Sequence, residues 1–156
     1  MPDLKPPRVA GDDRSVLLTL LQYQRDSFVR KVSGVDDAAA ASSPVVSGTS
    51  LLWLTNHMAD AEITWVLKRF ANRSPSAGVT DHAPTIEEAV DRYRRTWNDV
   101  DAVVASAPSL DECSPVFDDG PEVNLRWILA HLLEETARHA GHADILRELV
   151  DGTVGR

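Results

Sequence analysis

Cysteine is almost absent from this chain of 156 residues, in which Cys113 stands alone. A single thiol cannot form an intrachain disulfide, so a disulfide framework is excluded and a reducing cytoplasm is the simplest setting. Basic residues are also few: the chain has 16 Lys and Arg but 24 Asp and Glu. Nucleic-acid binding requires clustered Lys and Arg, and this acidic balance therefore argues against a nucleic-acid partner.

Long apolar runs are missing as well. No stretch approaches the roughly 20 apolar residues that span a bilayer, and the first residues lack the pattern of a signal peptide. The chain also has no glycine-rich phosphate loop and no signature of a Ser–His–Asp triad. We therefore expect one soluble domain over residues 1–156, with no membrane partner.

Four segments show the apolar repeat of a helix, and none shows that of a strand. They cover approximately residues 12–32, 50–72, 85–107 and 123–150. The third segment has the cleanest pattern, since it opens with the capping box Thr85-Ile86-Glu87-Glu88 and continues with a bundle seam. The predicted fold class is all-α, a four-helix bundle. The connections 34–50 and 108–122 are long enough for crossover loops, so simple up-and-down order is not required.

The predicted fourth helix is unusual because its buried face is apolar at both ends and polar in the middle. The polar positions are His131, Glu135, His139 and His142. They fall within about three turns of a helix, on roughly a quarter of its circumference. An unpaired carboxylate in a bundle core costs several kcal/mol, so another group must compensate for it.

A bound metal ion would provide that compensation. Glu135 and His139 are separated by four positions, so both side chains project from one face and could chelate one ion. A third ligand must come from another helix, and His57 is the histidine outside the fourth helix that lies in a predicted helix facing the core. Two imidazoles and a carboxylate suit zinc or nickel, and three protein ligands leave a position open, as in catalytic sites.

Other interpretations of the same residues stay open at this point. A core histidine is more often a hydrogen-bonded structural residue than a ligand, and Glu135 could pair with Arg138 or His131 instead. Helix spacing does not choose between the candidates, because i, i+3 and i, i+4 partners are nearly equivalent. His142 could be an acid/base, or a polar residue at the mouth of the bundle or a dimer contact. His131 could orient Glu135.

Further residues carry weaker signals. Asp60 and Glu62 are secondary candidates because they lie near His57 in the sequence, and Arg138 could bind an anionic substrate group or pair with a neighbouring carboxylate. Cys113 lies in an acidic loop, which raises a thiol pKa and argues against a nucleophile. The tryptophans are expected to fill the core and interfaces. They are Trp53, Trp65, Trp97 and Trp127.

At these positions the chain resembles a known family. Segments 17–31, 50–62 with Trp65, and 125–148 are similar to the DinB/YfiT-like superfamily of four-helix metalloproteins. The resemblance is closest to the actinobacterial branch named after a Streptomyces mini-circle protein. The superfamily has a histidine triad, and the related mycothiol-dependent maleylpyruvate isomerases use His, Glu and His. The resemblance implies metal ligands at His57, Glu135 and His139, with Glu135 where the commoner pattern has histidine.

The resemblance also implies a function. It indicates a divalent-metal-dependent S-transferase or isomerase, in which a small-molecule thiol of the mycothiol type reacts with a small electrophilic substrate. The thiol would be supplied by this cofactor, which fits a chain without a suitable cysteine. His142 is then the candidate catalytic residue. The alternative is a non-catalytic helical module, either a metal-binding protein or a stress-response homodimer packed through helix faces.

Overall fold

The computed structural model describes residues 4–115 and 120–154. Regular structure in these ranges is helical. The elements are α1 (Asp13–Val32), α2 (Asp37–Ala41), α3 (Leu51–Glu62), the π-helix η1 (Ile63–Phe70), α4 (Ile86–Ser106) and α5 (Leu125–Asp151). Extended pairing within the same ranges is limited to an isolated bridge between Cys113 and Asn124. None of the described helices is both long and apolar enough to span a membrane. The all-α prediction is confirmed.

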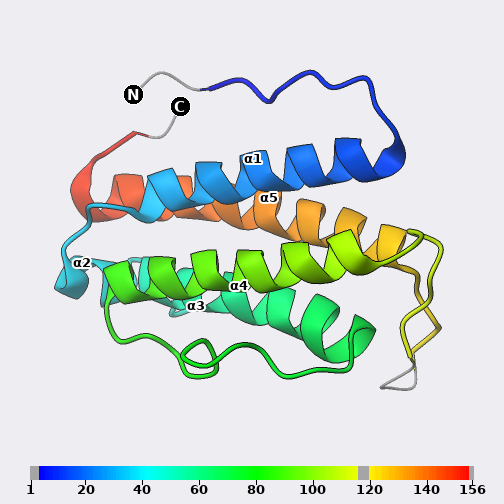
Figure 1. Cartoon of the computed structure of the whole chain (residues 1–156). Helices are drawn as coiled ribbons and strands as arrows, with labels where there is room; N and C mark the ends of the chain where they lie inside the picture. The colour runs from blue at the N-terminus through cyan, green and yellow to red at the C-terminus, as the bar shows by residue number, and fades with distance from the viewer. Residues whose placement is uncertain (1–3, 116–119, 155–156) are drawn as a thin grey trace.

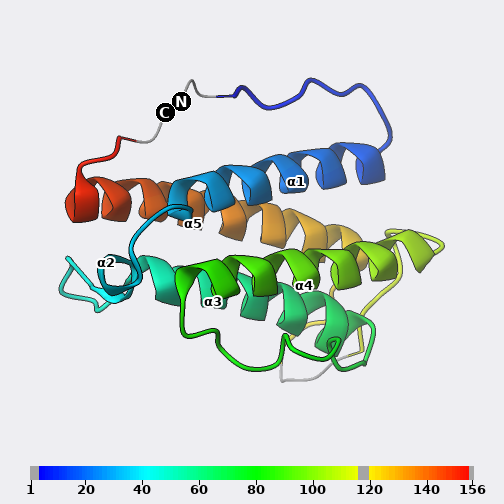
Figure 2. The ribbon, with the colours of Figure 1, turned by 60° about the vertical axis from the view of Figure 1, so that its left-hand side comes forward.

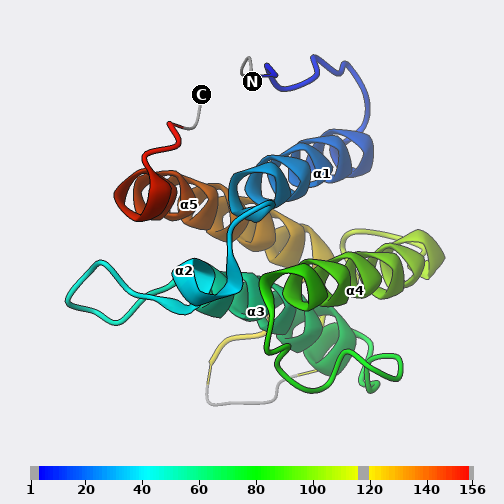
Figure 3. The same cartoon turned by 90° about the vertical axis from the view of Figure 1, so that its left-hand side faces the viewer.

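The long helices form a bundle of two parallel pairs. α1 and α5 run in one direction and pack against each other, and α3 with η1 runs alongside α4 in the opposite direction (Figures 1 and 2). Figure 3 shows the same pairs viewed towards the ends of the helices. The connection 71–85 returns along the bundle from the end of η1 to the start of α4 (Figure 1). A crossover loop is therefore present.

The position of this crossover differs from the sequence prediction. The connections 34–50 and 108–122 are long enough for crossovers, but each joins two antiparallel helices whose linked ends lie at the same end of the bundle (Figure 2). The reason is that α3 and α4 are parallel, so the chain must return along their full length between them. The length of a connection does not by itself show whether the two helices that it joins are parallel.

Capping side chains explain where the long helices begin. The caps Asp12, Ser50, Thr85 and Asn124 each accept a hydrogen bond from the backbone N–H three residues later. The observed helix bounds consequently lie close to those predicted. Gly152 ends α5 with a φ of 75°, a left-handed conformation that glycine adopts without strain.

The connection 34–50 contains a helix that the sequence reasoning did not identify. α2 has 5 residues and is capped by the side chain of Asp36, which accepts from the N–H groups of Ala38 and Ala39. Only Ala40 within it is buried. A helix of this length is too short to show an apolar repeat, so the sequence pattern does not predict it.

The crossover connection is hydrogen-bonded to α3 at Asn56, the residue before His57. The Asn56 amide donates to the Ala83 carbonyl at 3.0 Å and accepts from the Ala83 N–H at 2.9 Å. Arg92 of α4 is 1% exposed, and it donates to the carbonyls of Val79 and Asn56, both at 2.9 Å. These bonds hold in place the turn of α3 that carries His57.

The core also contains a buried ion pair between α1 and α3. Nη2 of Arg25 lies 2.6 Å from Oε2 of Glu62, and the two side chains are 1% and 0% exposed. Burial raises the pKa of Glu62, although the Arg25 charge opposes this effect. Glu62 was a secondary candidate near the predicted metal site. Its carboxylate is instead committed to Arg25.

Candidate metal centre

Three side chains from α3 and α5 meet where these helices pack together. Nε2 of His57 lies 3.3 Å from Oε1 of Glu135, and Nε2 of His139 lies 3.0 Å from the same oxygen. One donor atom from each residue lies within 4.8 Å of the other two. Among the described residues this is the one group of His, Cys, Asp or Glu side chains close enough to share a metal ion. These are the three residues that the sequence predicted as ligands.

Electrostatics favour the protonation states that metal ligation requires. Burial raises the pKa of Glu135, but hydrogen bonds from His57 and His139 outweigh this effect and hold the pKa below its ordinary value. Burial lowers the pKa of His139, and this effect prevails over the opposing influence of Glu135. At neutral pH Glu135 is therefore ionised and the His139 imidazole is neutral, as a ligand must be.

The second nitrogen of His139 and the ring face of His57 are also in contact with neighbouring side chains. Nδ1 of His139 lies 3.2 Å from Nδ1 of His142, so His139 turns its Nε2 towards Glu135 and its other nitrogen away. The ring of His57 is stacked on Trp53, with centroids 4.9 Å apart and planes 6° apart. Ligating histidines commonly have their second nitrogen hydrogen-bonded, which fixes the ring orientation. The donor set and its surroundings thus fit a divalent ion.

Arg138 contacts the other oxygen of Glu135. Its Nη1 donates to Oε2 of Glu135 at 3.2 Å, and its Nη2 donates to Glu134 at 2.5 Å. The pairing of Arg138 with neighbouring carboxylates, one of the sequence interpretations, is therefore present. Because Oε2 faces Arg138, Oε1 is the oxygen directed towards both histidines.

His131 packs in an aromatic group, and its suggested role of orienting Glu135 finds no support in its contacts. Its ring is stacked on Trp127 with centroids 5.0 Å apart and meets Trp65 of η1 at 4.8 Å. The Arg69 guanidinium lies 4.3 Å from the centroid of the Trp65 ring. Trp127 and His131 are four positions apart, so the sequence places them on one face of a helix. Their packing against Trp65 depends on how η1 meets α5.

The weaker candidates lie outside the group of three. Asp60 accepts hydrogen bonds from Arg92 at 2.5 Å and from His82 at 2.6 Å. Cys113 is exposed, and loss of hydration together with the carboxylates of Glu122 and Asp111 raises the pKa of its thiol. The prediction that Cys113 is a poor nucleophile agrees with this direction.

A cleft of about 240 Å³ opens beside His142. Its walls come from the segment before α3 and from α5. The lining residues are Val45, Ser47, Thr49, His142, Ile145 and Leu146. The contribution of Val45, Ser47 and Thr49 could not be predicted from the sequence, because their segment shows no periodicity and meets α5 only in the folded chain.

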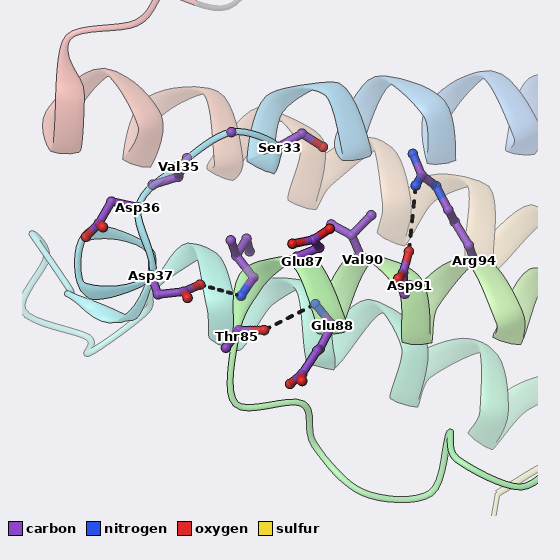
Figure 4. Close-up of a pocket in the computed structure, with 12 residues that line it drawn as sticks. Ser33, Val35, Asp36, Asp37, Thr85, Glu87, Glu88, Val90, Asp91 and Arg94 are labelled. Atoms are coloured by element: carbon purple, nitrogen blue, oxygen red, sulfur yellow. Dashed lines mark hydrogen bonds and ion pairs between the residues drawn. The ribbon is translucent and has the colours of Figure 1, made fainter.

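A larger pocket of about 760 Å³ lies where α2 and the start of α4 meet the end of α1 (Figure 4). Several of its polar side chains are engaged in helix capping. Oδ1 of Asp37 accepts from the N–H of Ile86 at 3.0 Å, and Oγ1 of Thr85 accepts from the N–H of Glu88 at 3.3 Å. These bonds give Asp37 and Thr85 a role in starting α4.

Comparisons with known proteins agree with this architecture. Residues 16–152 match the family model described as Mycothiol-S-transferase. Among solved structures, the chain is similar to the crystal structure of a conserved protein from Enterococcus faecalis, with 18% sequence identity and a TM-score of 0.65. The alignment covers 92% of this chain and 100% of that one. At such identity the likeness shows the fold alone. A comparison with curated proteins gave no match.

Proposed function

The chain belongs to the mycothiol-S-transferase family, and from this premise we propose that it is a divalent-metal-dependent enzyme that transfers mycothiol to a small electrophile or isomerises such a substrate. The observation that carries the proposal is the convergence of His57, Glu135 and His139, whose donor atoms lie within 4.8 Å of one another. Zinc or nickel is the expected ion, since both accept imidazole and carboxylate ligands.

The reaction would use a thiol that the chain itself does not provide. The sulfur attacks an electrophilic carbon, a C–S bond forms, and the leaving group departs with the bonding electron pair while the thiol proton passes to a base or to water. When bound, a divalent ion with an open position would supply a Lewis acid that lowers the pKa of the thiol. A free thiol also fits the reducing cytoplasm expected from the cysteine content.

The chain's own residues would hold the ion and fix its surroundings. The ionised Glu135 offsets the positive charge, and the imidazoles of His57 and His139 provide neutral donors. If His139 ligates through Nε2, its proton lies on Nδ1 and is donated to Nδ1 of His142 at 3.2 Å. His142, which also lines the cleft, is therefore the residue that we assign to proton transfer beside the reacting groups.

The proposal can be tested with protein purified without a histidine tag. Zinc-loaded protein should accelerate the reaction of mycothiol with 1-chloro-2,4-dinitrobenzene, and Glu135→Gln should abolish the acceleration while retaining the helical circular dichroism. His82→Ala is the matched control, because His82 lies outside the group and is 62% exposed. Metal-loaded wild-type protein that gives no acceleration with this or other electrophiles would sink the proposed activity.

Thiol binding can be measured independently of turnover. In cobalt-loaded protein, coordination of the thiol sulfur should produce a sulfur-to-metal charge-transfer band when mycothiol is added. A metal-loaded protein with neither this band nor thermal stabilisation by mycothiol would instead support the non-catalytic metal-binding module.

A further inference from the structure

We propose that the cleft beside His142 is the binding site for the electrophile and that it selects small, uncharged, apolar molecules. This inference rests on the proposed function, because it assigns one of the two substrates of that reaction to a particular place.

The position of the cleft favours this assignment. His142 lines the cleft, and its Nδ1 lies 3.2 Å from Nδ1 of His139. One side chain therefore separates the cleft from a candidate metal ligand. A molecule held in the cleft would lie beside the group of three residues where the thiol is expected to bind.

The lining of the cleft is suited to an apolar occupant. Val45, Ile145 and Leu146 contribute hydrocarbon, and no Asp, Glu, Lys or Arg is among the lining residues. Two hydroxyls are present, but Oγ of Ser47 and Oγ1 of Thr49 lie 2.9 Å apart and hydrogen-bond to each other. A charged substrate would find no counter-charge on these walls, whereas an apolar one would gain from leaving water.

The size of the cleft limits what can enter it. Its volume of about 240 Å³ is below the range of about 300–1,000 Å³ that is typical of sites for drug-sized ligands. Mycothiol, a cysteine derivative carried on a sugar and a polyol, is larger and strongly polar. We therefore assign the cleft to the electrophile and not to the thiol.

Ile145 offers a way to fill the cleft without disturbing the core. Its side chain is 60% exposed, whereas the neighbouring Leu146 is 3% exposed and belongs to the core. Leu149 lies one turn further along α5, is 56% exposed and does not line the cleft. Ile145→Trp and Leu149→Trp consequently form a matched pair of substitutions.

A series of epoxides tests the selectivity. The thiol proton of mycothiol passes to a base or to water, and the sulfur attacks the terminal carbon of the epoxide. The C–S bond forms as the C–O bond breaks, and the resulting alkoxide takes a proton from water. Wild-type protein should prefer 1,2-epoxyhexane to glycidate, a charged epoxide. Ile145→Trp should lower kcat/KM for 1,2-epoxyhexane by roughly 10-fold or more with the KM for mycothiol unchanged. Leu149→Trp should change neither value.

A binding measurement separates failure of the cleft from failure of the proposed function. In ¹⁵N-labelled zinc-loaded protein, the unreactive probe 1-hexanol should shift the amide signals of Ser47, Thr49 and Ile145, and Ile145→Trp should remove these shifts. Binding of hexanol without any thiol transfer would refute the activity and leave the cleft as an apolar binding site. Transfer that prefers glycidate, or that Ile145→Trp leaves intact, would overturn the proposal.

Discussion

Nε2 of His57 lies 3.3 Å from Oε1 of Glu135, although the two residues are 78 positions apart in the sequence. The contact joins the middle of α3 to the middle of α5. A metal ion bound by both residues would therefore require these two helices to be packed against each other. Such an ion would stabilise the folded chain relative to the unfolded one.

Glu135→Gln and His57→Ala should each eliminate stoichiometric metal binding. Either substitution leaves two ligands and weakens chelation, and Glu135→Gln also removes the negative charge that would offset the ion, whereas neither residue contributes to the apolar core. Elemental analysis of tag-free protein, with circular dichroism as the check on folding, measures this outcome. His82→Ala should retain the metal. Full metal content in Glu135→Gln would exclude this carboxylate as a ligand.

His142→Ala should weaken zinc binding by about 10- to 100-fold without abolishing it, because it removes the partner of Nδ1 on His139. Competition with a chromophoric chelator gives the dissociation constant. His131→Ala is the comparison, since the ring of His131 contacts tryptophans and not the ligands. Equal affinities in wild type and His142→Ala would show that this hydrogen bond does not position His139.

In the metal-free protein, His139 should titrate below its ordinary pKa of 6.5. Burial disfavours the imidazolium, whereas Glu135 favours it, so Glu135→Gln should lower the pKa of His139 further. The unfolded chain binds this proton more readily, and stability linked to His139 is therefore lost as the pH falls below 6.5. NMR titration of the imidazole Cε1–H reports the pKa. A rise on replacing Glu135 would contradict the electrostatic account.

Arg25→Met should destabilise the fold by about 3–5 kcal/mol, because it leaves the Glu62 carboxylate buried without its partner. Glu62 is 0% exposed, so water cannot replace the lost ion pair without rearrangement. The double variant Arg25→Met, Glu62→Leu should recover much of the loss, since it removes both charges. Urea denaturation measures each free energy of unfolding. A double variant no more stable than Arg25→Met would contradict this explanation.

The local signals in the sequence predicted much of the helical structure. Thr85 was recognised as the start of a capping box, and it does cap a helix. The polar interruption in the fourth helix also identified Glu135 and His139, because i, i+4 spacing places both side chains on one face. These predictions depend on residues within a few positions of each other, which interact in the same way whatever the rest of the chain does.

Other features depended on how distant segments pack. Glu62 and Asp60 lie within five residues of His57 in the sequence and were therefore candidate ligands. In the folded chain, however, Arg25 hydrogen-bonds to Glu62, and Arg92 and His82 hydrogen-bond to Asp60. Likewise, His131 contacts Trp65 of η1 and not Glu135. Which side chains meet depends on how each helix is rotated about its axis relative to its neighbours. The spacing of residues in the sequence does not specify this rotation for two helices joined by a loop.

The sequence by itself determined the helical segments and the polar stripe of α5, because capping and helical periodicity are short-range effects. Only the tertiary structure decided the parallel pairing of α3 with α4, the crossover along 71–85 and the short distance between His57 and Glu135. It also decided the cleft beside His142, whose walls come from two segments far apart in the sequence, with Val45 and Ile145 separated by 145 − 45 = 100 positions. Long-range packing, driven by burial of apolar faces, brings such residues together.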